Sequence, residues 1–234
     1  MADVVVAADA QTSVVGTDDA PFPRRLPSIP AYDLPTEEEL PRNRADWALE
    51  PRRAALLIHD MQRYFVDAFT PDSAPIVPVT AHIRALADKA RAMNIPIFYT
   101  AQNGDQDRRD RGLQADLWGP GMRHVPQHQP VIDDLTPQEG DFVLVKHRYS
   151  AFQRSNLETL MRARGRDQLL ICGVYAHIGC LMTAGEAFQR DIEPFFVADA
   201  LGDFSRDWHD MALTHAADCC AMVHSTRQIL ELLK

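Results

Sequence analysis

Four segments of the sequence end in polar groups that could do chemistry together. One apolar run ends in His59-Asp60, a second runs into Thr100-Ala101-Gln102, a third ends at Lys146, and a fourth runs into the glycine-containing segment 173–179. A carboxyl group can transfer a proton, an ammonium group can hold an anion, and an amide can orient a polar substrate. Taken singly, each is more often an ordinary turn or surface residue. Their functional meaning depends on whether the fold brings them together.

The rarity of lysine in this chain supports a functional role for Lys146. The chain has 21 arginines but only three lysines, so arginine is its default cation. At the end of an apolar strand it nevertheless keeps a compact ammonium group, which differs from a guanidinium in geometry and hydration. This choice indicates a chemical role.

The elements that must position these residues follow an α/β pattern. Short β-rich apolar runs predict six strands, at 54–59, 96–100, 142–146, 168–172, 195–198 and 221–224. Apolar residues recur at helical spacing over 79–90, 181–188 and 208–219, and Ser155 with Glu158 forms a capping-box pattern that opens a further helix. We therefore expect a three-layer α/β fold with a mainly parallel sheet. Ligands of such sheets bind at the carboxyl ends of the strands, where the polar groups lie.

The first 50 residues differ in composition from the rest. Seven of the 16 prolines lie between positions 21 and 51, and an acidic run spans 37–39. We expect residues 1–25 to be a disordered leader and the following residues to form an arm on the surface. Residues 26–234 then make a single domain.

Charge and hydropathy exclude several classes of protein. The 234 residues carry a formal net charge of −9, and the arginines are scattered among acids, so bulk electrostatic binding to nucleic acid or an anionic membrane is not expected. No apolar run approaches the ~20 residues that span a bilayer, and the first 23 residues lack the Lys or Arg of a secretory signal. We expect a cytoplasmic protein.

The four cysteines are Cys172, Cys180, Cys219 and Cys220, and none forms a CxxC pair. Buried thiols explain them better than a disulfide framework or a zinc site.

Several motifs, in order along the chain, closely resemble the isochorismatase family. They span 56–62, 99–102, 117–122, 146–152, 173–179 and 197–201, and the likeness runs from about Ile29 to near the C-terminus. The resemblance implies a three-layer α/β fold shared with nicotinamidases and N-carbamoyl amidases, which use an Asp, Lys, Cys triad.

The triad pattern is incomplete in this chain. Asp60 and Lys146 match its first two members, but the cysteine position falls on Gly179 and Cys180 is one residue late. One residue along a helix rotates a side chain by about 100°, so Cys180 should point away from Asp60 and Lys146. A thiol nucleophile is therefore not expected. The resemblance then implies an isochorismatase or a phenazine-pathway 2-amino-2-deoxyisochorismate hydrolase, which release pyruvate from a vinyl ether without a metal or other cofactor.

Vinyl-ether hydrolysis begins with protonation of the terminal methylene carbon, and we expect Asp60 to be the general acid. The neighbouring Lys146 should lower the pKa of Asp60, the wrong direction for an acid at neutral pH. We expect the two carboxylates of the substrate to neutralise Lys146 and to raise the pKa of Asp60 in the complex.

Candidates for binding the substrate carboxylates are Arg111, Gln102 and backbone N–H groups of the helix beginning near His177. Gly179 should leave room for the enolpyruvyl group or the attacking water. The resemblance adds a cis peptide bond between Val174 and Tyr175. It also implicates cavity residues Tyr175, Trp118 and Tyr64, although core packing explains the last two equally well.

A metal site at His59 and Asp60 is not expected, because strand alternation sends adjacent side chains to opposite faces.

Two rival functions remain at this stage. A cysteine amidase needs a thiol facing Asp60, and a non-catalytic partner of a carrier protein needs no acid at all. We expect no carrier domain to be fused after the amphipathic segment 229–233, so any carrier is expected to act in trans. The family resemblance also implies a homo-oligomer, commonly a dimer. The sequence does not separate isochorismate from its 2-amino analogue, nor siderophore from phenazine biosynthesis, two branches of secondary metabolism.

Overall fold

The computed structural model describes residues 26–234, so the expected leader at 1–25 lies outside the described residues. Within them, six parallel strands form one sheet in the order β3-β2-β1-β4-β5-β6. The strands are β1 (Ala54–His59), β2 (Ile97–Ala101), β3 (Phe142–Val145), β4 (Gln168–Val174), β5 (Glu193–Gly202) and β6 (Met222–His224). All six predicted strands are present, and the sheet confirms the α/β fold class.

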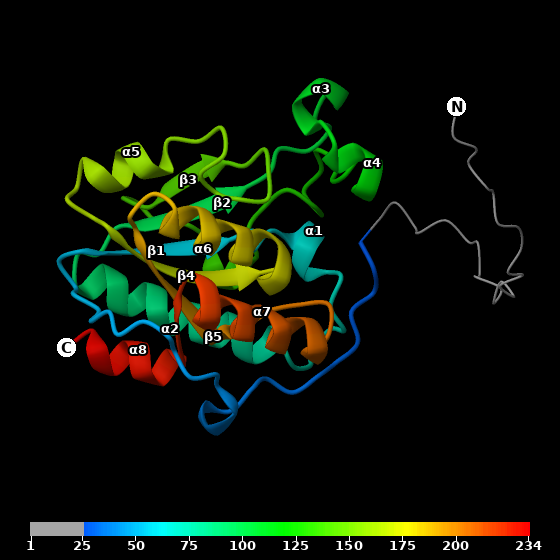
Figure 1. Ribbon diagram of the computed structural model, residues 1–234. Helices are drawn as coiled ribbons and strands as arrows, with labels where there is room; N and C mark the ends of the chain where they lie inside the picture. The colour runs from blue at the N-terminus through cyan, green and yellow to red at the C-terminus, as the bar shows by residue number, and fades with distance from the viewer. Residues whose placement is uncertain (1–25) are drawn as a thin grey trace, which may run out of the picture.

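Helices cover both faces of the sheet (Figure 1). One face carries α2 (Ile76–Ala92) and α8 (Thr226–Leu232), and the other carries α5 (Leu157–Arg162), α6 (Leu181–Phe188) and α7 (Arg206–Cys219). Alternate residues of β1 join the two hydrophobic cores, Leu56 the first and Leu57 the second. A parallel strand covered on both sides must be apolar throughout, which is why β1 is a continuous apolar run.

Short helical segments lie in the loops after the strands. They are α1 (Arg63–Val66) after β1, α3 (Arg108–Arg111) and α4 (Gln114–Trp118) after β2, and the π-helical turn η3 (Ala176–Cys180) after β4. Two 3₁₀ turns, η1 (Glu37–Glu39) and η2 (Asp133–Leu135), complete the elements of the described residues.

The direction of winding changes between β1 and β4. From β1 the chain continues to β2 and β3 on one side, whereas from β4 it continues to β5 and β6 on the other. A crevice opens at such a switch point, outside the carboxyl ends of the strands. The polar groups singled out in the sequence follow β1, β2, β3 and β4, so the topology brings them to this edge.

Residues 26–53, which precede β1, run along the sheet and its helices as an extended arm (Figure 1). Ile29 is fully buried, and its backbone N–H donates to the carbonyl of Ala68. Further along, the Tyr32 hydroxyl accepts the Asp203 N–H at 2.8 Å. The arm is therefore attached to the loops at the carboxyl edge of the sheet.

The predicted start of α5 is right, but its capping box is wrong. Asn156 is the N-cap residue and makes no side-chain cap. The Ser155 hydroxyl donates to the Ala151 carbonyl, and the Glu158 carboxylate pairs with Arg190 instead of reaching the helix start. The Ser155 hydroxyl also accepts the Leu157 N–H at 3.2 Å, so its partners are local, whereas Glu158 pairs both with Arg162 and with the distant Arg190.

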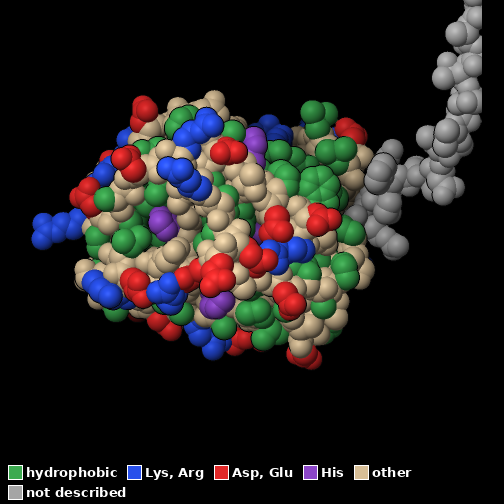
Figure 2. All heavy atoms as spheres, turned by 60° about the horizontal axis from the view of Figure 1, so that its bottom comes forward, with side chains coloured by type: hydrophobic (Ala, Val, Ile, Leu, Met, Phe, Trp, Pro, Cys, Tyr) green, Lys and Arg blue, Asp and Glu red, His purple; other side chains and the backbone are tan. Residues whose placement is uncertain are grey.

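The face shown in Figure 2 carries Lys and Arg interspersed with Asp and Glu, without a continuous basic field. In the part of the chain that the structure describes, no helix has the length and apolar character needed to cross a membrane.

Candidate active site

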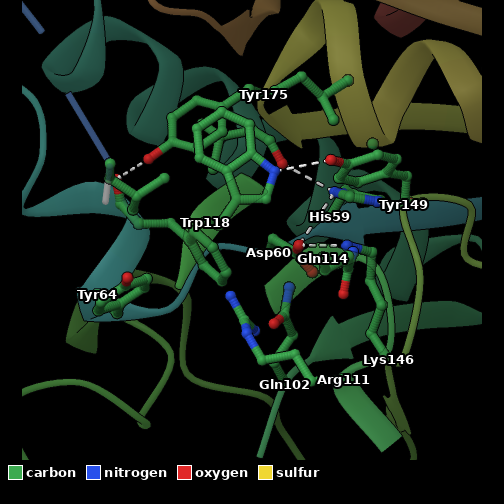
Figure 3. A pocket seen from close by; sticks show the side chains of 15 residues that line it. His59, Asp60, Tyr64, Gln102, Arg111, Gln114, Trp118, Lys146, Tyr149 and Tyr175 are labelled. Carbon is green, nitrogen blue, oxygen red and sulfur yellow. Dashed lines mark hydrogen bonds and ion pairs between the residues drawn. The ribbon is translucent and has the colours of Figure 1, made fainter. Parts of the chain in front are cut away.

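A cavity lies at the carboxyl edge of β1 and β4, and it brings together every predicted site residue (Figure 3). In that view Gln102, Arg111 and Lys146 lie on one side, opposite Trp118 and Tyr175. The predicted residues that line the cavity are Asp60, Tyr64, Gln102, Arg111, Trp118, Lys146, Tyr175 and Gly179.

Asp60 and Lys146 form a buried ion pair. Lys146 Nζ donates to Asp60 Oδ2 at 2.6 Å, and both side chains are less than a tenth exposed. The Thr100 hydroxyl donates to Asp60 Oδ1 at 2.6 Å and accepts the Asp60 N–H at 3.1 Å. Burial acts to raise the pKa of Asp60, but the Lys146 charge and the donated hydrogen bonds outweigh it, so the pKa lies below its ordinary value. The free site therefore holds an aspartate, as the sequence predicted.

The backbone at Asp60 explains an error in the sequence interpretation. Asp60 has φ +51°, in the left-handed region that residues with a Cβ seldom adopt. The strand alternation therefore ends at His59, and both side chains line the same cavity, with His59 Nδ1 3.8 Å from Asp60 Oδ2. The prediction that they point to opposite faces is wrong. Among residues 26–234, no three His, Cys, Asp or Glu side chains are grouped closely enough to share a metal ion.

Gly179 lines the cavity, but the volume that a side chain at this position would take up is not open to a ligand, contrary to expectation. A Cβ built on Gly179 would lie 2.8 Å from His59 Nε2 and closer still to Cε1. The imidazole of His59 occupies the volume next to the glycine.

Arg111 is a buried cation at the cavity wall. Its Nε donates to the Gly119 carbonyl at 2.6 Å, and no carboxylate of the described residues forms a salt bridge with it. Gly121 has φ +77°, which favours glycine, and a Cβ there would lie 2.5 Å from Arg111 Cζ and would displace the guanidinium. Burial lowers the pKa of Arg111, yet a guanidinium stays charged in a protein. A buried cation without an acidic partner can bind a substrate carboxylate.

Gln102 is oriented by a residue that the sequence interpretation missed. Gln62 is fully buried, its Oε1 accepts the Gln102 N–H at 2.7 Å, and its Nε2 donates to the Gln102 carbonyl at 2.9 Å. Gln62 lies two residues after Asp60 within the 56–62 motif, and this place in the motif is the sequence feature that could have identified it as a site residue.

Aromatic side chains complete the cavity wall. Trp118 Nε1 donates to the Tyr149 hydroxyl at 2.7 Å, and Tyr149 itself lines the cavity, as does Gln114. The Tyr175 hydroxyl donates to the Phe65 carbonyl at 2.8 Å, so it is already engaged within the protein. Neither Tyr149 nor Gln114 was predicted, although Tyr149 lies within the 146–152 motif of the family.

The turn after β4 has fewer free N–H groups than predicted. The His177 N–H donates to Asp203 Oδ2 at 2.7 Å, and the N–H groups of Ile178 and Cys180 both donate to the Tyr175 carbonyl. These three donors are therefore not available to a substrate carboxylate, and that prediction is wrong for them. His177 Nδ1 also lies 2.5 Å from Asp203 Oδ1, so its side chain anchors the turn.

Two other expectations for this turn are confirmed. The peptide bond between Val174 and Tyr175 is cis. Cys180 is fully buried in the second hydrophobic core with Ala184 and does not line the cavity. Burial raises the pKa of the Cys180 thiol well above its ordinary value, which keeps it protonated.

Comparisons with known proteins identify the same motifs. A family model described as "Isochorismatase domain" matches residues 54–228. The chain is 50% identical over 209 residues to "Isochorismatase" of Bacillus subtilis, covering 89% of this chain and 67% of that protein. It is 50% identical over 208 residues to "Phenazine biosynthesis protein PhzD1" of Pseudomonas aeruginosa, covering 88% and 99%. A solved cysteine hydrolase from Pseudomonas syringae pv. phaseolicola has 26% identity and a TM-score of 0.72, covering 82% and 97%.

Proposed function

Since the chain belongs to the isochorismatase family, we propose that this hydrolase cleaves the vinyl ether of isochorismate to 2,3-dihydro-2,3-dihydroxybenzoate and pyruvate. The observation that carries the proposal is the buried Asp60–Lys146 pair, which faces a glycine at position 179 where a cysteine hydrolase needs its thiol. This arrangement supplies an acid and no covalent nucleophile.

Asp60 acts as a general acid in the proposed reaction. Its carboxyl proton goes to the terminal methylene carbon, and the alkene electrons form the new C–H bond, which leaves an oxocarbenium ion. Water adds to this ion and gives up a proton, forming a hemiketal. The hemiketal then collapses: its hydroxyl loses a proton as the carbonyl of pyruvate forms, the bond between its carbon and the ring oxygen breaks, and the ring oxygen takes up a proton to become a hydroxyl of the second product. Arg111 and Gln102 hold the polar groups of the substrate during these steps.

Proton transfer requires a protonated Asp60, whereas the free site favours the ionised form. The proposed substrate carries two carboxylates, and the cavity presents two cations, Lys146 and Arg111. A carboxylate bound at Lys146 offsets the charge that holds down the pKa of Asp60, so protonation is coupled to binding. The high-pH limb should then appear at higher pH in kcat than in kcat/KM. Coincident limbs would contradict the coupling.

A second substrate, 2-amino-2-deoxyisochorismate, is favoured by the similarity to a phenazine biosynthesis protein along nearly its whole length. The two substrates differ by a ring hydroxyl or amino group. Gln102 and Gln114 line the cavity, and an amide offers both a donor and an acceptor to either group. Pyruvate release measured with both substrates tests the proposed function. No release from either would overturn it, and the ratio of kcat/KM values would show whether the product suits catechol siderophore or phenazine biosynthesis.

The rival functions are tested by separate variants. A cysteine amidase would lose its activity in Cys180→Ala, whereas vinyl-ether hydrolysis should survive because Cys180 lies outside the cavity. A non-catalytic carrier partner would release no pyruvate.

The assembly and compartment are further parts of the proposal. We propose a homodimer, because α4, α6 and α7 expose large apolar side chains, including Leu117, Met182 and Trp208. Sedimentation equilibrium should give twice the chain mass of 26.3 kDa, and a monomer would contradict it.

We also propose a cytoplasmic location, since the four cysteines are free and three are buried. A carrier protein acting in trans remains a prediction.

A further inference from the structure

Position 179 is a glycine for a reason that lies outside its own backbone. Its φ is not in the left-handed region, so the backbone conformation would accept any L-residue. The obstacle is one side chain. A Cβ at Gly179 would lie 2.8 Å from Nε2 and 3.2 Å from Nδ1 of His59, and still nearer to Cε1. Cβ atoms essentially never approach a non-bonded atom closer than 3.0 Å.

His59 has no simple way to move aside. Its side chain is fully buried, with Nδ1 2.8 Å from the Val174 carbonyl and Nε2 3.3 Å from the Tyr149 carbonyl. Burial lowers the pKa of His59, so the ring is neutral and carries one N–H, which the shorter contact assigns to Nδ1. Rotating the ring would break this bond inside a packed core.

The location of His59 also matters for Asp60. The imidazole joins the end of β1 to the end of β4 through the Nδ1–H bond to the Val174 carbonyl, and its Nε2 lies against the loop after β3 at Tyr149. These segments carry Asp60, Gly179 and Lys146, respectively. The ring therefore lies among the three positions that form the catalytic triad pattern of the cysteine hydrolases.

We propose that His59 is the specificity-determining residue of this cavity: its imidazole fills the volume that a side chain at position 179 would occupy, and so excludes a nucleophile there. The proposal rests on the proposed function, because it explains how the cavity is restricted to acid catalysis by Asp60. It makes His59 and Gly179 an interdependent pair. A change at position 179 should be tolerated only when His59 is replaced by a smaller residue.

A thermal double-mutant cycle tests the pair without any substrate. Gly179→Ala alone should lower Tm by roughly 5 °C, because overpacking a core is destabilising and the domain is large. The same substitution in a His59→Ala background should lower Tm by less than a third of that amount. If His59→Ala does not fold, His59→Val replaces it. Equal losses in both backgrounds, or a Gly179→Ala protein with the wild-type Tm, would overturn the proposal.

His209 provides the matched control for losing a buried imidazole. It is also fully buried, with Nε2 2.9 Å from the Ala198 carbonyl and Nδ1 3.1 Å from the Tyr32 hydroxyl, and it does not line the cavity. In a His209→Ala background, Gly179→Ala should lower Tm by as much as it does in the wild-type background. If His209→Ala also reduced the Tm loss caused by Gly179→Ala, the effect would reflect a general loosening of core packing, and the specific pairing of His59 with Gly179 would be overturned.

A thiol introduced at position 179 provides a chemical readout. All variants carry Cys219→Ser, which removes the exposed native cysteine. The thiol introduced by Gly179→Cys in a His59→Ala background should react with iodoacetamide at pH 7 at least tenfold faster than the thiol introduced by Gly185→Cys. The reason is that Lys146 stabilises a thiolate in the cavity, whereas a Cβ at Gly185 meets no atom within 4 Å.

Labelling at position 179 no faster than at position 185 would contradict the proposal. Absence of pyruvate release by the wild-type enzyme would overturn the proposed function but leave the thermal cycle and the labelling rates unaffected, so the two failures are distinguishable.

Discussion

Replacing Thr100 by valine tests how the protein holds the acid. The Thr100 hydroxyl donates to Asp60 Oδ1 at 2.6 Å and accepts the Asp60 N–H at 3.1 Å, and it is almost fully buried. Valine keeps the β-branched shape that suits a strand but has no hydroxyl. The substitution therefore removes both hydrogen bonds with little change in side-chain volume.

The hydrogen bond to the Asp60 carboxylate sets the size of the effect. A bond to a charged group contributes about 1.5–3 kcal/mol. A loss of this size lowers Tm by roughly 3–12 °C in a domain of about 200 residues. Because the hydroxyl stabilises the ionised carboxylate, its removal raises the pKa of Asp60. The protonated acid then persists to higher pH, and the high-pH limb of kcat/KM should move upward.

The assay is the pH profile of pyruvate release, with a thermal melt of the same sample. Thr226→Val is the matched control, since Thr226 Oγ1 donates to Asp199 Oδ1 at 2.7 Å, and Thr226 does not line the cavity. The control should also lose stability but keep the wild-type limb. If the limb of Thr100→Val stays in place or moves to lower pH, the reasoning about Asp60 is refuted.

Four further predictions concern the charges of the cavity. Arg111→Met should lower kcat/KM by roughly 10- to 100-fold, mainly through KM, because a charge-assisted contact is lost; unchanged steady-state kinetics would remove Arg111 from substrate binding. Gly121→Ala should raise KM in the same assay while keeping the cation, since its Cβ displaces the guanidinium, and a normal KM would contradict this. Lys146→Ala should cost about 3–5 kcal/mol in urea unfolding, as removing one partner of a buried ion pair does, and should impair both binding and turnover. The lowered pKa of Asp60 contributes stability above its unfolded pKa of about 3.9 that is lost as pH falls through the folded pKa. The stability advantage of the wild type over Asp60→Asn should therefore shrink below about pH 4, and a constant difference would argue against it.

The fold was largely predictable because its signals are local and repeated. Strands covered on both faces, such as β1, are continuous apolar runs, and α2 and α7 follow the apolar spacing of the sequence. The edge at which Asp60 and Lys146 meet follows from the rule that parallel strands present their carboxyl ends together. The capping box at Ser155 failed because its hydroxyl bonds to the Ala151 carbonyl and the Leu157 N–H, while Glu158 pairs with Arg162 and Arg190; the Ser-x-x-Glu pattern does not indicate these alternative partners.

The interior of the site was less predictable for a physical reason. Strand alternation gives the direction of a side chain only while the strand continues, and the left-handed backbone at Asp60 means that the alternation stops at His59 and does not apply to Asp60. For this reason His59 was assigned to the wrong face and Gly179 was interpreted as open space. Gln62 and Tyr149 act through hydrogen bonds to residues distant in sequence, and spacing alone does not indicate those bonds.

The central claim is that Asp60 protonates the substrate, and the most direct measurement is kcat for pyruvate release by Asp60→Asn, an isosteric change that removes the acid. General acid catalysis contributes roughly 10²- to 10⁴-fold, so kcat should fall by that factor while the substrate Kd, measured by calorimetry on the inactive variant, stays within a few-fold of the wild-type KM. An Asp60→Asn enzyme that releases pyruvate within tenfold of the wild-type rate would contradict the claim.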